Sequence, residues 1–247
     1  MRGYHLGKNT FWEPRFQCIS WMIITVFCLF SVGLALTRGD AKNAVLAAAT
    51  ILLVTLPRFL SRFGGVRMVN WLYALVSIYA AGPLLGTFYK LYYYTFWWDD
   101  LLHLTGGVVF AIVGWYWVRA LNGRARNTLI LCGVFAVCFS VTLSACWEML
   151  EFCIDRLFAM DMQVDTIVDT IHSYHLSQVP GVRGTLEGIT EVTVNGTPLG
   201  VRGYLDLGLT DTIRDMFVES LGALLCAEVL IWDRERHVLL IKTGGEV

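Results

Sequence analysis

Six long apolar stretches recur along the chain and are separated by more polar segments. A helix needs roughly 20 predominantly apolar residues to cross a bilayer. The second stretch is the shortest of the six, and Pro57 is expected to close it. The pattern predicts an all-α membrane protein, with 1–247 as a single integral membrane domain. Its six-helix transmembrane bundle would have spans at about 16–37, 43–57, 68–88, 100–120, 128–152 and 211–232.

Composition agrees with this reading. Hydrophobic residues make up 56% of the chain and charged residues 16%, whereas soluble domains carry roughly 25% charge. The net charge is −1, and no basic face with interleaved aromatic residues occurs, so nucleic-acid binding is not expected. The seven cysteines lie in or beside the apolar stretches without zinc-finger spacing, which is typical of small buried apolar residues.

The distribution of Lys and Arg predicts the orientation of the spans. The short loops on one side hold only Arg38, Lys42 and Lys90. Cytoplasmic loops carry an excess of Lys and Arg. Both termini are therefore expected in the cytoplasm and 153–210 outside it. Twelve of the nineteen basic residues lie on the cytoplasmic side in this scheme: Arg2, Lys8, Arg15, Arg58, Arg62, Arg67, Arg119, Arg124, Arg126, Arg234, Arg236 and Lys242.

The 153–210 segment is expected to be an extracytoplasmic insertion between the fifth and sixth spans. Apolar residues recur on one helical face of 161–176, which predicts an amphipathic helix lying on the membrane surface. Asn195-Gly196 predicts a β-hairpin with a type I′ turn, with Pro198 on an edge strand. His172 and His175 lie in this segment too. They could cap a site or bind a metal, although a solvated face explains them better.

Ionisable residues gather at the outer ends of the last three predicted spans. An ionised carboxylate in hydrocarbon costs several kcal/mol. It is therefore a poor explanation that such residues occur independently at one depth on three helices. A shared polar site is the better one, and a divalent cation, shared protons or pairing with Arg214 would offset the repulsion. The groups are Asp99 and His103, Glu148 and Glu151, and Asp211 and Asp215, with Glu219 one turn deeper.

The residue types in this group predict a division of roles. We expect Glu148 and Asp215 to be catalytic. One imidazole among carboxylates suits Zn, Mn or Fe, but the sequence does not choose the metal. Glu219 fits a buried structural hydrogen bond as well as a function, and Gly107 and Gly222 fit close packing of helices. The expected ligands of a divalent metal ion are Asp99, His103, Glu151 and Asp211.

Three motifs carry a resemblance to a known family. WDDLLHLTGG, WEMLEF and DTIRDMFVESLGALL occur in that order between residues 97 and 226. Together they resemble the signature of the YjdF-like bacterial inner-membrane proteins, and more distantly VanZ-like proteins. The resemblance implies a multi-pass protein of the bacterial plasma membrane and brings no established activity. It implies importance for Asp99, His103, Glu148, Glu151, Asp211, Asp215 and Gly222. The long segment between the second and third motifs departs from the family pattern.

Three kinds of function fit these observations. The first is a metal-dependent enzyme in the lipid bilayer that acts on a lipid or on a lipid-linked envelope precursor. The second is a proton- or cation-coupled transporter, in which acidic side chains relay protons or bind cations. The third is a non-catalytic membrane scaffold, in which the polar cluster holds the helices together.

Overall fold

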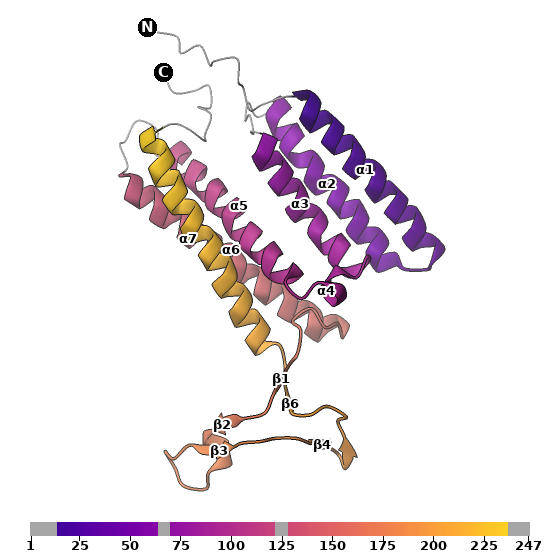
Figure 1. Ribbon diagram of the computed structural model, residues 1–247, viewed down its shortest axis with the longest axis vertical. Helices are drawn as coiled ribbons and strands as arrows, with labels where there is room; N and C mark the ends of the chain where they lie inside the picture. The colour runs from indigo at the N-terminus through magenta and orange to yellow at the C-terminus, as the bar shows by residue number, and fades with distance from the viewer. Residues whose placement is uncertain (1–13, 64–69, 122–127, 237–247) are drawn as a thin grey trace. The chain divides into compact units, whose positions relative to one another are not determined.

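The computed structural model describes residues 14–63, 70–121 and 128–236 (Figure 1). Long helices dominate it, and short strands occur only between the last two of them. Two compact units can be distinguished: residues up to 141 together with those from 218 onward, and residues 142–217. The helices are α1 (Pro14–Thr37), α2 (Ala41–Phe63), α3 (Asn70–Thr87), α4 (Leu91–Tyr94), α5 (Trp98–Leu121), α6 (Leu129–Phe158) and α7 (Leu209–Arg236).

Each of the six predicted apolar stretches coincides with one long helix. Among the described residues, α1, α2, α5 and α6 are long and apolar enough to cross a membrane. That α3 and α7 also cross the membrane, which would make six spans, therefore stays a prediction. Orientation also stays a prediction, since several of the basic residues behind it lie outside the described residues: Arg2, Lys8, Arg67, Arg124, Arg126 and Lys242.

The prediction that Pro57 closes the second helix is wrong. Helix α2 runs on to Phe63 with Pro57 inside it. Proline removes one backbone hydrogen bond, but each later residue of the helix can still bond to the carbonyl group four positions before it. Helix α2 is accordingly longer than the sequence pattern suggested, at 23 residues.

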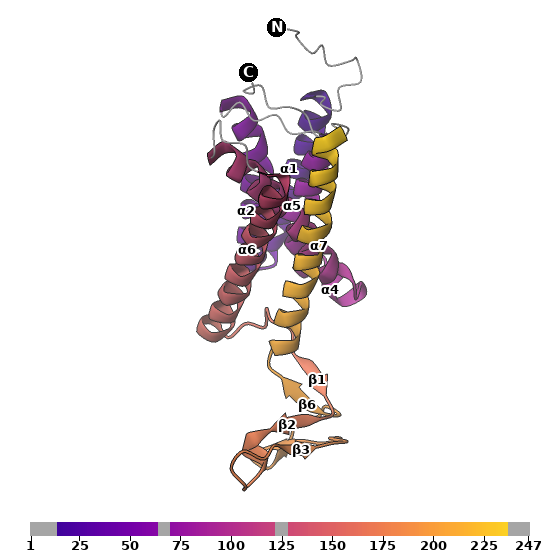
Figure 2. The same ribbon diagram turned by 90° about the vertical axis from the view of Figure 1, so that its left-hand side faces the viewer.

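In the first unit, small side chains let the helices pack closely. Cys28, Ala47 and Leu84 form the buried centre of a cluster made by α1, α2 and α3. A second cluster lies around Trp115 of α5, which is 1% exposed, and includes Ala223 of α7. Figures 1 and 2 show α5 alongside α7 in this unit.

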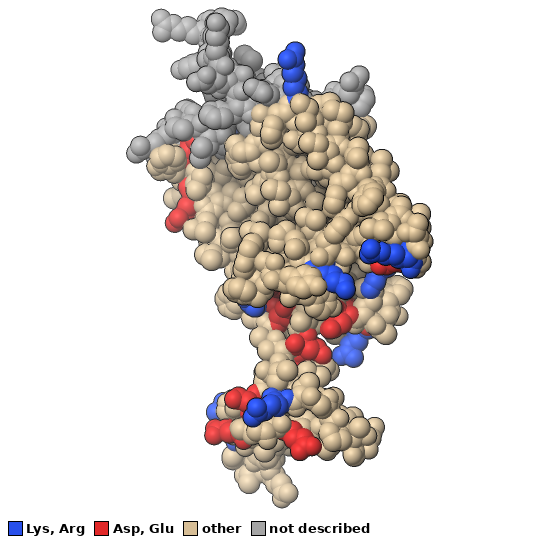
Figure 3. Space-filling view, turned by 45° about the vertical axis from the view of Figure 1, so that its right-hand side comes forward, with Lys and Arg blue, Asp and Glu red and all other residues tan. Residues whose placement is uncertain are grey.

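The outward faces of the helices are apolar. On α1, for example, Ile23 and Phe30 are each 64% exposed. Figure 3 shows a broad area of uncharged side chains over the helices, with Lys and Arg at its borders. Such a surface would be unfavourable in water and is typical of helices that face lipid.

The second unit contains three antiparallel strand pairs between α6 and α7. They are β1 (Thr166–Val168) with β6 (Tyr204–Asp206), β2 (Ile171–Ser173) with β3 (Gly184–Leu186), and β4 (Thr193–Val194) with β5 (Thr197–Pro198). A single 3₁₀ turn, η1 (Tyr174–Leu176), follows β2.

The predicted amphipathic helix over 161–176 is wrong, because β1, β2 and η1 occupy this segment. Thr166, Ile167 and Val168 are β-branched, which favours extended backbone, and they pair with residues far along the chain. The predicted hairpin is confirmed. Asn195 and Gly196 have φ values of 54° and 80°, the two positive angles that a type I′ turn requires.

Candidate functional site

Helix α5 begins with acidic residues, and its first turns place an imidazole beside one of them. Asp99 and His103 are four residues apart on α5 and therefore share a face. The His103 Nε2 atom lies 3.8 Å from Asp99 Oδ1. Asp99 and Asp100 both lie in the first turn, where the helix dipole favours negative charge.

The other ring nitrogen of His103 faces a carboxylate from a different helix. His103 Nδ1 lies 3.7 Å from Glu219 Oε2 of α7. The side chain of Asp99 is 36% exposed, that of His103 10% and that of Glu219 4%. These three residues, the His–carboxylate cluster, therefore lead from an accessible end to a buried one.

Two glycines allow α5 and α7 to approach closely enough for this contact. A Cβ atom added to Gly107 would overlap the backbone carbonyl oxygen of Glu219, and one added to Gly222 would overlap that of Leu104. The two helices thus touch through their backbones next to the cluster. The predicted packing role of Gly107 and Gly222 is confirmed.

The distances in the cluster are longer than hydrogen bonds. Nitrogen–oxygen hydrogen bonds measure about 2.7–3.2 Å. Two ligand atoms that each lie about 2.0–2.2 Å from a zinc-sized ion can be as much as ~4.2 Å apart, so the 3.8 Å between His103 Nε2 and Asp99 Oδ1 fits a shared cation better than a hydrogen bond. In addition, Glu219 Oε1 is buried and has no hydrogen-bond partner among the described residues. A buried carboxylate oxygen in this state is costly unless a cation compensates it.

The remaining predicted site residues lie in the second unit, at the ends of α6 and α7. Glu148, Glu151 and Asp215 are buried. Glu151 accepts a hydrogen bond from Trp147 Nε1 at 2.8 Å, and Asp211 accepts one from the backbone N–H of Val164, also at 2.8 Å. Glu151 and Asp211 therefore take part in local structure within this unit, and the role of all four acids in a metal site stays a prediction.

A three-residue segment, 162–164, joins the end of α6 to the start of α7 within the second unit. The Asp155 carboxylate of α6 accepts the backbone N–H groups of Met162 and Gln163, at 2.7 and 2.9 Å. The Gln163 side chain then donates to Thr212 Oγ1 of α7 at 2.5 Å. We call 162–164 the strap. The sequence did not reveal it, because the same residues suggested a surface helix.

The bonds of Asp155 to the strap predict a structural effect of its replacement. Asp155→Ala should leave two backbone N–H groups without their acceptor and cost about 2 kcal/mol locally. Hydrogen exchange measured by mass spectrometry should show faster exchange at Met162 and Gln163. Asp161→Ala is the control, since Asp161 is exposed nearby. Equal exchange in the two variants would contradict the role of Asp155.

The two histidines of the strand segment lie outside any such cluster. His172 is exposed on β2, with Nδ1 2.9 Å from Thr185 Oγ1 of β3, and His175 is exposed on η1. Their exposure agrees with the solvated face favoured by the sequence.

Comparison with known proteins agrees with the membrane architecture. A family model described as "Predicted membrane protein (DUF2238)" matches residues 19–236. The chain belongs to this family. The match covers α2 to α7 completely and most of α1, and it confirms the YjdF-like resemblance; a relation to VanZ-like proteins stays a prediction. No curated protein and no solved structure matches the chain. Membership in the DUF2238 family and four apolar helices indicate a multi-pass membrane protein.

Proposed function

We propose that this member of the DUF2238 family is a metal-dependent membrane enzyme that binds one divalent ion at the His–carboxylate cluster. One observation carries the proposal: His103 has a carboxylate beside each ring nitrogen, and one of these carboxylates is buried with an unbonded oxygen. A buried Glu219 is unfavourable in a membrane helix on its own. A cation in the cluster offsets its charge.

Each residue of the cluster has its own role in this proposal. His103 Nε2 and Asp99 offer the two ligand atoms on the accessible side. Glu219 lies on the Nδ1 side, 3.7 Å from that nitrogen, where its negative charge attracts the ring N–H and favours the opposite nitrogen as the metal ligand. The site would be open near Asp99, the most exposed of the three, which leaves a position for water and substrate.

The predicted roles of the other acids belong to the same proposal. Asp215 precedes Glu219 by four residues on α7, so helix periodicity gives the two a common face. We assign proton transfer to Asp215 and Glu148, and further metal ligation to Glu151 and Asp211. A bound divalent ion supplies a Lewis acid for the hydrolysis of an ester or phosphoester. The apolar surroundings favour a lipid or lipid-linked substrate.

The transporter alternative has less support. A carrier needs polar groups that continue through the bundle. Between Glu219 and Asp233, the buried side chains that α7 contributes to the core are small or apolar: Ala223, Cys226, Ala227 and Leu230. The buried Asp233 lies beyond this apolar stretch. The interruption favours a site at one end of the helices over a path through them.

Metal analysis of the purified protein tests the proposal. We expect the wild-type chain in detergent to bind one Zn²⁺, Mn²⁺ or Fe²⁺, measured by mass spectrometry of the metal and by calorimetry. His103→Ala should weaken binding by about 100-fold, while His172→Ala, which alters an exposed histidine, should not. If none of these ions binds the wild type, or if both variants bind equally well, the proposal is wrong.

A further inference from the structure

The strand segment, residues 159–208, buries none of its apolar side chains. Its strands are only two or three residues long, and an isolated strand pair is marginally stable in water. Exposed apolar patches of this kind mark interaction sites. The large apolar side chains exposed here are Val164, Ile167, Tyr174, Leu176, Val179, Val182, Leu186, Val194, Leu199, Tyr204 and Leu207.

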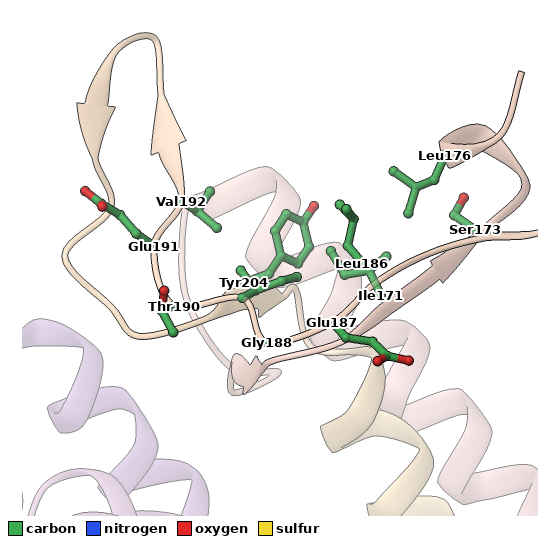
Figure 4. A pocket seen from close by; sticks show the side chains of 11 residues that line it. Ile171, Ser173, Leu176, Leu186, Glu187, Gly188, Thr190, Glu191, Val192 and Tyr204 are labelled. Atoms are coloured by element: carbon green, nitrogen blue, oxygen red, sulfur yellow. The ribbon is translucent and has the colours of Figure 1, made fainter.

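Part of this apolar surface forms a groove of about 720 Å³. The residues that line it include Ile171 of β2, Leu186 of β3, Tyr204 of β6 and Leu176 of η1 (Figure 4). The groove is thus built from strands of two different pairs. Since each strand pair has only two members, β2 and β3 also keep an outer edge on which an extended chain can pair.

Charge narrows the choice of occupant. Six acids and two arginines in 159–208 give a net charge of −4, with the histidines neutral. Glu187 and Glu191 line the groove on either side of Tyr204 (Figure 4). Elsewhere in the segment, burial and the neighbouring acids Asp161, Asp206 and Asp155 raise the pKa of Asp165. A second copy of this surface or an anionic lipid surface would meet like charge.

The geometry points to a binding site for an extended segment of a partner protein that carries both apolar and basic side chains. The apolar side chains of the partner occupy the groove between Leu186 and Tyr204, and its Lys or Arg side chains pair with Glu187 and Glu191. This inference is independent of the proposed metal site, because all of its residues belong to the strand segment.

Peptide binding to the full-length chain in zwitterionic nanodiscs tests the inference. The probes are two fluorescent octapeptides, one of alternating Leu and Lys and one of alternating Leu and Glu, with empty nanodiscs as background. We expect the Lys peptide to bind about tenfold more tightly than the Glu peptide by fluorescence anisotropy. The double variant Glu187→Lys with Glu191→Lys reverses the charge of both groove acids and should weaken binding of the Lys peptide about tenfold.

The matched control is the double variant Asp161→Lys with Asp169→Lys, which changes the net charge by the same amount at positions outside the groove. This pair should weaken binding of the Lys peptide less than about threefold. Equal losses in the two double variants would show attraction to the segment as a whole and would overturn the inference. So would equal binding of both peptides, or loss of chain dimers in the groove variant alone, which would make the groove an interface between copies.

Discussion

Replacing Gly107 by alanine is expected to destabilise the protein by at least about 1–3 kcal/mol, the usual cost of overpacking a core. The added methyl group would overlap the Glu219 carbonyl oxygen and would lie 2.9 Å from the backbone nitrogen of Ala223. Both are backbone atoms, which cannot rotate away as a flexible side chain can. Helices α5 and α7 must therefore separate, and the His–carboxylate cluster separates with them. Thermal unfolding in detergent measures the loss.

Gly33 offers a matched control in another helix. It lies within α1, and a Cβ atom added there meets nothing within 4 Å. Since glycine is the poorer helix former by about 1 kcal/mol, Gly33→Ala should leave stability unchanged or raise it. The two substitutions are chemically identical, so a loss of stability in Gly107→Ala alone would isolate the contact between the helices. Similar unfolding temperatures for both variants would mean that α5 and α7 do not meet as described.

The sequence predicted the long helices well because a membrane imposes two strong requirements. Apolar side chains must continue for about 20 residues, and every backbone group must bond within the helix. The same reasoning failed where these requirements do not apply. Around Ile167 the spacing of apolar residues was compatible with a helix or with strands. The chain forms a strand there because Ile167 pairs with Leu205, which is distant in the sequence. No local pattern contains that information.

The candidate site was predictable to a similar extent. The spacing of Asp99 and His103 placed them on one face of α5, and the structure brings them together. Glu219 was left open between structure and function, because the sequence does not specify the register of α7 against α5. That register depends on backbone contacts at Gly107 and Gly222. The strap through Gln163 depends on a turn that only the folded chain reveals.

Replacing Glu219 by leucine should have opposite effects on metal binding and on the stability of the metal-free protein. In the absence of metal, Glu219 is a buried carboxylate with one unbonded oxygen. Substituting a buried charge by an apolar side chain of similar size is often neutral or stabilising by about 1–4 kcal/mol. Loss of the group that orients a metal-binding histidine, in contrast, typically weakens affinity by about 10–100-fold. The Glu219→Leu variant should therefore unfold at an equal or higher temperature without metal, yet gain less stability from added Zn²⁺ than the wild type.

Glu228 is the control on the same helix. It is exposed two to three turns beyond Glu219, so Glu228→Leu should leave zinc affinity unchanged. A purely structural Glu219 would give a different result: its replacement would lower the unfolding temperature of the metal-free protein and leave the stabilisation by zinc intact. Calorimetric titration and unfolding curves recorded with and without zinc distinguish these outcomes. They do so without knowledge of the substrate, because stabilisation by a ligand depends only on its affinity and concentration.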